Sequence, residues 1–279
     1  GNTGTLTMPR VGMLSQIIVQ FRGTVTDPTA LQKLAPWAFM SRFRVNTNIG
    51  SASLVDLSGF GAFLLQRLQQ RTFRPDAGDG VSLTPSADIH AAPLGAGAQT
   101  WVLTWVLPIS ANRGPNFEAG LINLQAPEIS VTLEAQFGAL TDAATRISAV
   151  SGNLHVYYEY YEIPDPTVFA MPPLTLVRSL EEQQAIGQTG ENIYTVPRMG
   201  TLLQLMHRIT LNGARSDSFD STAIRFNKTD SVYVDERQEL RVLERLQFGT
   251  SPITGVVVRD FWGAYDAVSM GDTRDAIDS

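Results

Sequence analysis

Histidine is the residue type in this sequence with the widest range of chemistry, because its imidazole binds metals and transfers protons near neutral pH. The chain has three, His90, His155 and His207. None has a second His at the spacing of a metal-binding motif such as H-x-x-x-H. The chain also has no Cys, which excludes thiolate ligands and Cys nucleophiles. His155 and His207 fall in alternating segments, so we expect surface or interface imidazoles and no metal site.

Serine and glycine form no catalytic or phosphate-binding motif in this chain. No G-x-S-x-G is present to expose a nucleophilic serine. The glycine-rich stretches 59–61 and 95–97 are not followed by Lys-Ser or Lys-Thr, as a P-loop requires, and they indicate turns instead. We therefore expect no catalytic residue, no cofactor and no cofactor-binding residue.

Five aspartates lie in segments rich in Gly, Ser and Asn, where their oxygens could bind a hard cation such as calcium. They are Asp76, Asp79, Asp217, Asp220 and Asp230. Their spacing does not match D-x-D-x-D-G, so solvated loops are the favoured interpretation. A carboxylate pair for glycoside hydrolysis would meet only in the fold, and nothing in the sequence points to one.

Tyr157, Tyr158, Tyr160 and Tyr161 form the densest aromatic cluster of the chain. Such a cluster can stack on sugars. Two glutamates stand among these tyrosines, and the favoured interpretation is a sandwich strand with tyrosines at its core and interface edges.

Alternation of apolar and polar residues predicts the elements that carry these side chains, because successive residues of a strand point to opposite faces. The longest clear case is Ile129–Phe137. Further strands are expected at Gly4–Met8, Gln16–Arg22, Met40–Val45, Trp101–Leu107, Leu154–Tyr161, Leu205–Leu211, Ala223–Phe226, Ser231–Val234 and Gly255–Arg259. The pattern predicts an all-β protein.

Helical spacing occurs in three short places. Leu57–Leu68 and Leu240–Leu246 carry leucines three or four residues apart, and Leu176–Ala185 is expected to be a third short helix. None of them alternates with strands at the spacing of a βαβ unit, which excludes a doubly wound parallel sheet.

Composition narrows the class of protein further. The chain has 279 residues, 43% of them hydrophobic and only 17% charged, with a net charge of −6. The 21 Lys and Arg residues are scattered, which argues against a dedicated nucleic-acid surface. No segment approaches about 18 consecutive apolar residues, and the start lacks the features of a signal peptide. We expect neither a membrane span nor a visible targeting signal.

The chain contains an internal repeat. Thr7–Ile17 matches Thr195–Leu205 at six of eleven positions, and Leu65–Gln69 matches Leu243–Gln247 at four of five. The blocks occur in the same order at nearly the same offset, which indicates a duplication. Arg10 and Arg198 are equivalent in the first block, and a structural role at strand ends is favoured for them over a paired anion site.

Proline and glycine residues between 163 and 190 predict a boundary between the two copies. The expected organisation is a first domain at 1–163, a linker with a short helix at 164–191 and a partial second domain at 192–279.

These features together resemble a known family. The segments Phe43–Gln69 and Ile224–Gln247, each reading as two strands and a short helix, resemble the double-jelly-roll major capsid proteins of tailless icosahedral viruses. The bacteriophage members of tectivirus and corticovirus type are the most similar in size. The resemblance implies an all-β fold of two tandem jelly-roll β-sandwiches with short helices, each with eight strands in two facing sheets. Leu154–Tyr161 is then the last strand of the first roll.

The second copy reads as incomplete at its C-terminus. It has about 90 residues, enough for roughly five or six strands, and lacks a match for Ile129–Phe137 or Leu154–Tyr161. The favoured expectation is that the sequence lacks its natural C-terminus. Completion of the second sandwich by another chain, or a reduced second module, are the alternatives.

The resemblance implies a structural virion protein, without enzymatic activity, that self-assembles into pseudo-hexagonal trimeric capsomers of an icosahedral shell. Its implied partners are itself and other virion proteins, and an internal membrane where the shell encloses one, with no sequence-specific nucleic-acid binding; the sequence does not tell whether this shell encloses a membrane. Its implied location is the virion, after synthesis in the host cytoplasm. The alternative is a carbohydrate- or receptor-binding β-sandwich, such as a spike or lectin-like module, and a β-sandwich glycosidase or lyase ranks third.

Overall fold

The computed structural model describes residues 2–31, 36–49, 53–69, 92–110, 119–162, 175–185, 190–196, 202–211, 214–226, 230–248 and 254–261. Strands dominate these residues and helices are few and short, which confirms the predicted all-β class. The strands are β1 (Thr3–Thr7), β2 (Met13–Thr26), β3 (Ala30–Leu31), β4 (Met40–Thr47), β5 (Ser53–Leu57), β6 (Ala98–Pro108), β7 (Ile122–Asn123), β8 (Val131–Phe137), β9 (Ala144–Thr145), β10 (Ala149–Tyr161), β11 (Ser179–Leu180), β12 (Gln204–Arg208), β13 (Thr210–Leu211), β14 (Ala214–Arg215), β15 (Ser221–Phe226), β16 (Asp230–Glu236) and β17 (Val256–Asp260). The helices are the 3-10 turn η1 (Trp37–Phe39), α1 (Gly59–Gln69), α2 (Leu140–Ala143) and α3 (Arg237–Phe248).

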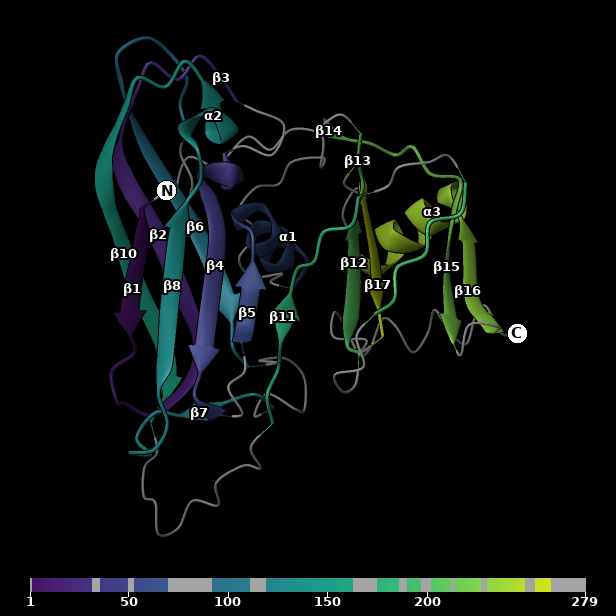
Figure 1. Ribbon diagram of the computed structural model, residues 1–279, viewed down its shortest axis with the longest axis horizontal. Helices are drawn as coiled ribbons and strands as arrows, with labels where there is room; N and C mark the ends of the chain where they lie inside the picture. The colour runs from purple at the N-terminus through teal and green to yellow at the C-terminus, as the bar shows by residue number, and fades with distance from the viewer. Residues whose placement is uncertain are drawn as a thin grey trace.

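The first part of the chain, from β1 to β11, forms two larger sheets (Figure 1) and the short pair β3-β9. The two larger sheets share one apolar core. One sheet has the strand order β1-β8-β4-β5-β11, and the other has the order β10-β2-β6, with β7 pairing with the start of β2. Neighbouring strands are antiparallel, except that β11 is parallel to β5. We call this sandwich the first copy.

Alternation along the strands explains which face of each sheet is buried. In β8, Val131, Leu133 and Ala135 are buried, whereas the intervening Thr132 and Glu134 are half-buried. The strand begins two residues later than the alternation predicted, since Ile129 lies in the preceding turn. The period of two therefore identified the inward face correctly.

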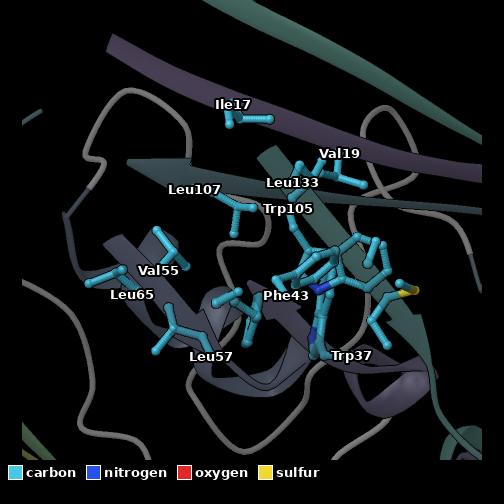
Figure 2. Packing of buried hydrophobic residues seen from close by; sticks show 14 of the residues in the cluster. Ile17, Val19, Trp37, Phe43, Val55, Leu57, Leu65, Trp105, Leu107 and Leu133 are labelled. Atoms are coloured by element: carbon cyan, nitrogen blue, oxygen red, sulfur yellow. The ribbon is translucent and has the colours of Figure 1, made fainter. Parts of the chain in front are cut away.

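Aromatic side chains fill the centre of this core, where each buries about 150–250 Å². The rings of Trp37 and Phe63 stack with their centroids 4.1 Å apart, and Trp105 meets Trp37 edge-on at 6.0 Å. Phe43 packs 5.3 Å from Trp105 (Figure 2). The indole Nε1 of Trp105 also donates a hydrogen bond to the carbonyl of Gly59 at 3.0 Å, so α1 is joined directly to β6.

Helix α1 begins at Gly59, two residues after the start of the predicted leucine stripe. Leu57 belongs to β5, where it pairs with Phe43 of β4 and is buried. Ser58 then caps the helix by accepting a hydrogen bond from the backbone N–H of Gly61 at 3.0 Å. From there on the predicted stripe is confirmed, with Leu64 and Leu65 buried.

The helix predicted at Leu176–Ala185 is wrong. Residues 175–185 are extended, and Ser179–Leu180 form β11 against Val55–Asp56 of β5. The linker at 164–191 therefore carries a strand where a short helix was expected; its residues 164–174 and 186–189 lie outside the described residues. Glu181 and Glu182, which were expected in that helix, instead bind residues distant in the sequence: Glu181 binds Ser58, and Glu182 binds Tyr194.

The second part of the chain, from β12 to β17, repeats the order of the first. Strands β15 and β16 form an antiparallel pair followed by α3, as β4 and β5 are followed by α1. In both parts the strand after the helix pairs with a strand that precedes the antiparallel pair: β6 pairs with β2, and β17 pairs with β12. We call this unit the second copy.

The predicted strand at Leu205–Leu211 is split into β12 and β13. Between them Ile209 donates its backbone N–H to the carbonyl of Gly255 at 2.7 Å, outside the strand ladder. The other predicted strands of the second copy, β15, β16 and β17, are each present within a few residues of the expected bounds.

Candidate functional site

The structure places the two described histidines on different sheets. His155 is exposed on β10, and His207 lies on β12 opposite Val257. Burial lowers the pKa of His207, and the positive charge of Arg259 lowers it further. His90 lies outside the described residues. Over the part of the chain that the structure describes, no group of three or more His, Cys, Asp or Glu side chains is placed to hold a metal ion.

Asp217 is a structural residue of the second copy. Its Oδ1 accepts a hydrogen bond from the backbone N–H of Gly255 at 2.6 Å and also pairs with Arg241. It thereby ties the loop before β15 to α3 and to the start of β17. Asp220 is exposed nearby. Asp76, Asp79 and the side chain of Asp230 lie outside the described residues.

Arg10 bridges two loops that end strands of the first copy. Its NH2 donates a hydrogen bond to the carbonyl of Pro127 at 3.0 Å, which joins the β1–β2 connection to the segment before β8. This is the structural role favoured from the sequence. Its repeat-related partner Arg198 lies outside the described residues, so the disfavoured alternative of a paired anion site is not tested.

A buried polar side chain occupies the same place on the helix of each copy. Gln66 Oε1 accepts a hydrogen bond from the backbone N–H of Val106 at 3.2 Å, and Glu244 Oε1 accepts one from the backbone N–H of Val258 at 2.8 Å. Gln66 is 1% exposed and Glu244 4%. Each therefore satisfies a donor of the strand that follows its helix, and fixes the helix to that strand.

We call Gln66 and Glu244 the anchors. The register of the strands shows that the two anchors occupy equivalent positions. Gln16 of β2 pairs with Pro108, and its repeat-related counterpart Gln204 of β12 pairs with Asp260. Val106 and Val258 stand two residues before those partners. The pentapeptide match in the sequence also aligns position 66 with position 244. Sequence analysis aligned these residues but did not identify them as anchors, because nothing local indicates that a polar residue on an apolar helix points inward.

The two anchors differ in charge, and their surroundings differ with them. Arg241, in the position equivalent to Phe63, pairs with Glu244 at 2.7 Å and with Asp217. Burial raises the pKa of Glu244, and the hydrogen bond from Val258 and the guanidinium of Arg241 only partly offset that increase. The second copy thus holds a cluster of ionisable side chains where the first copy has aromatic core.

The predicted tyrosine cluster lies on β10, at the end of its sheet in the described strand order. We call Tyr157, Tyr158, Tyr160 and Tyr161 the tyrosine edge. Their exposed fractions are 50%, 36%, 37% and 41%, and the rings of Tyr158 and Tyr160 stack 5.9 Å apart. Because successive strand residues point to opposite faces, these exposed rings lie on both faces of β10, which pairs with β2 along its other edge.

Helix α3 exposes apolar residues that are buried on α1. Val242 and Leu243 are 60% and 38% exposed, whereas the equivalent Leu64 and Leu65 are 4% and 3% exposed. The predicted stripe on this helix is therefore only partly buried: Leu240 is in the core, Leu243 is not, and the side chain of Leu246 lies outside the described residues. Together with the tyrosine edge, this gives the chain two exposed apolar surfaces of the kind found at protein interfaces.

Within the described residues, no helix has both the length and the apolar character needed to cross a membrane.

Comparison with protein-family models finds no matching family, and comparison with curated proteins finds no matching protein. Solved structures do match. The chain is similar to the crystal structure of the STIV MCP, with 17% identity and a TM-score of 0.63 over 95% of this chain and 81% of that one. It is also similar to a chain in the atomic structure of Sulfolobus Turreted Icosahedral Virus, with 17% identity and a TM-score of 0.61 over 95% of this chain and 76% of that one. At this identity the likeness establishes the fold, which is a double jelly roll.

Proposed function

We propose that this chain is a major capsid protein, the subunit from which an icosahedral virus shell is built. The observation that carries the proposal is the likeness of nearly the whole chain to the STIV MCP, a major capsid protein, in a fold made of two related copies. In this role the chain acts by burying surface between subunits, and it is structural rather than enzymatic.

Duplication within the chain supports a trimeric capsomer. Two similar sandwiches per chain give six per trimer, so a three-fold assembly has a nearly six-fold outline and can tile a hexagonal array with one kind of subunit. A low charged fraction of 17% suits such a protein, since the cores of interfaces are depleted of charge. The proposed domains are those expected from the sequence, at 1–163 and 192–279 with the linker between them.

The tyrosine edge is the surface that we assign to contacts between subunits. Tyrosine contributes a large, rigid area at low entropic cost, and it is enriched where interfaces form. The strand that carries it lies at the end of its sheet, and its tyrosines are between 36% and 50% exposed in the isolated chain. Burial in an assembly removes this aromatic surface from water.

The proposal extends to the setting of the shell. The chain belongs in the virion after synthesis in the host cytoplasm, with other virion proteins and an internal membrane as neighbours and without sequence-specific nucleic-acid binding. The sequence resemblance favours tailless bacteriophages of tectivirus and corticovirus type, whereas the solved structures come from Sulfolobus Turreted Icosahedral Virus. A capsid role is common to both.

Size-exclusion chromatography with light scattering tests the proposal. The expected result is a particle of three times the chain mass of 30.4 kDa. A monomer that binds glycans on the tyrosine edge would instead support a carbohydrate-binding sandwich and contradict the capsid role.

A further inference from the structure

The segment between the two copies is fixed to the first one before the second begins. Ser179–Leu180 extend the sheet beside β5, and Arg178 Nε donates a hydrogen bond to the carbonyl of Ser53 at 2.8 Å. The backbone N–H of Glu181 then reaches the carbonyl of Asp56 at 2.9 Å. This pairing places the side chain of Glu181 at the N-terminus of α1.

One carboxylate oxygen of Glu181 completes the cap of that helix. Its Oε2 accepts hydrogen bonds from both the backbone N–H and the hydroxyl of Ser58, each at 2.7 Å. The exposed N–H groups and the dipole of a helix N-terminus favour a negative charge there. Gly61 leaves room for it, because a Cβ at that position would lie 2.3 Å from Oε2.

The other carboxylate oxygen reaches the second copy. Glu181 Oε1 pairs with NH2 of Arg208, on β12, at 3.0 Å, and both side chains are about three-quarters buried, with 26% and 24% exposed. The guanidinium of Arg208 also lies over the ring of Phe60 on α1, 5.5 Å from its centroid. A single carboxylate therefore joins the helix of the first copy to a strand of the second.

Apolar contact between the copies does not by itself set their angle. Val256 and Val258 of β17 belong to the same buried cluster as the core of the first copy, and Met206 packs against it. Hydrophobic contact of this kind is non-directional, whereas a partly buried ion pair with fixed hydrogen bonds specifies one geometry.

We propose that Glu181 is a positioning residue that locks the second copy in one orientation on the first, and that regular self-assembly requires this lock. The requirement for self-assembly rests on the proposed function. A shell closes only if every subunit presents its contact surfaces at the same angles, so a variable angle between the copies would spread those surfaces over many geometries.

The angle can be measured in the isolated chain, which has no Cys to interfere with labelling. Spin labels at Ser151→Cys on β10 and Gln238→Cys on α3, both exposed positions, report the distance between the copies by pulsed electron paramagnetic resonance. We expect a narrow distribution in the labelled wild type. Glu181→Gln removes the ion pair and should broaden and shift the distribution, with little change in melting temperature.

Glu182→Gln is the matched control. It makes the same charge change one residue away, where the carboxylate accepts a hydrogen bond from Tyr194 instead of touching α1, and it should leave the distribution narrow. Arg208→Gln tests the lock from the other copy and should broaden the distribution as Glu181→Gln does. Arg208→Lys keeps the charge and should restore most of the narrow distribution.

The outcomes distinguish the lock itself from its role in assembly. An unchanged distribution in Glu181→Gln or in Arg208→Gln would overturn the lock. A broad distribution in variants that assemble as well as wild type would overturn the requirement for assembly. If the wild type itself fails to assemble, the proposed function fails, and the distance measurement still decides the lock.

Discussion

Gln66 and Glu244 make the same hydrogen bond in the two copies, each from a buried side-chain oxygen on a helix to a backbone N–H of the strand that follows, at 3.2 and 2.8 Å. The bond has been kept although one anchor is neutral and the other acidic. Equivalent position and equivalent partner are what a duplicated unit predicts, and the shared hydrogen bond adds a structural likeness to the short sequence matches.

Glu244→Gln should remove a pH dependence from the stability of the second copy. Because burial raises the pKa of Glu244, the folded chain keeps this proton to a higher pH than the unfolded chain does. Its contribution to the free energy of unfolding therefore falls as pH rises from the usual carboxyl pKa to the raised one. Denaturant titrations across this interval should show that the free energy of unfolding of the variant rises relative to that of wild type as pH rises. A difference that does not vary with pH would contradict this account.

Gln66→Glu is the reciprocal change and should be severely destabilising at neutral pH. Position 63 is Phe where the second copy has Arg241, so the new carboxylate would be buried without the cation that Arg241 provides to Glu244. An uncompensated buried charge costs about 3–5 kcal/mol. Most of this loss should be recovered in acid, where the carboxyl group is neutral. A melting temperature equal to that of wild type at neutral pH would show that the anchor is not buried as described.

Leu65→Ala and Leu243→Ala test the different burial of equivalent positions on the two helices. Leu65 is 3% exposed, and its truncation should cost about 2–5 kcal/mol of unfolding free energy. Leu243 is 38% exposed, and its truncation should change that energy by about 0.5 kcal/mol or less. Chemical denaturation of both variants makes the comparison, and equal losses would contradict it.

Asp56→Asn should weaken the first copy at neutral pH and matter less in acid. Burial raises the pKa of Asp56, but Arg42, which binds both of its oxygens at 2.5 and 2.6 Å, and Arg44 outweigh that effect, so the pKa is lowered. This contribution is present above the usual carboxyl pKa and is lost as pH falls through the lowered value. The pair is partly exposed, so we expect a loss of about 1 kcal/mol or less. Melting curves at pH 7 and pH 3 should show the difference shrinking, and a constant difference would argue against the ion pair.

Tyr157→Ser combined with Tyr161→Ser should reduce self-association while leaving the melting temperature of the chain nearly unchanged. Both rings are exposed on the tyrosine edge, at 50% and 41%, so their removal takes little from the core. Sedimentation velocity measures the fraction of oligomer. Tyr194→Ser, at an equally exposed tyrosine away from β10, is the control. If only the control loses the oligomer, or if both variants keep it, the interface lies elsewhere.

The fold could largely be predicted from the sequence because most strands have one inward face. Alternation located β2, β6, β8 and β10, and the repeat predicted that the order of strands and helix would recur. Boundaries were less accurate where pairing decides them. Leu57 fits a helical stripe and a strand equally well, and only its partner Phe43 in the sheet places it in β5.

The contacts that join distant segments could not be predicted. Glu181 lies in a stretch with helical character, and its roles arise from Ser58, 123 residues earlier, and from Arg208 beyond the linker. The anchors were hidden in the same way, since a polar residue within an apolar helix reads locally as an exposed position. The one sign of the anchors in the sequence was that the matching pentapeptides differ only at their position, where Gln66 stands opposite Glu244.

Electron cryo-microscopy of the purified oligomer tests the central claim most directly. The account predicts a three-fold particle with six sandwich densities, two from each chain, related in pairs by the duplication. A particle with one sandwich per chain, or a chain that remains monomeric at high concentration, would contradict it.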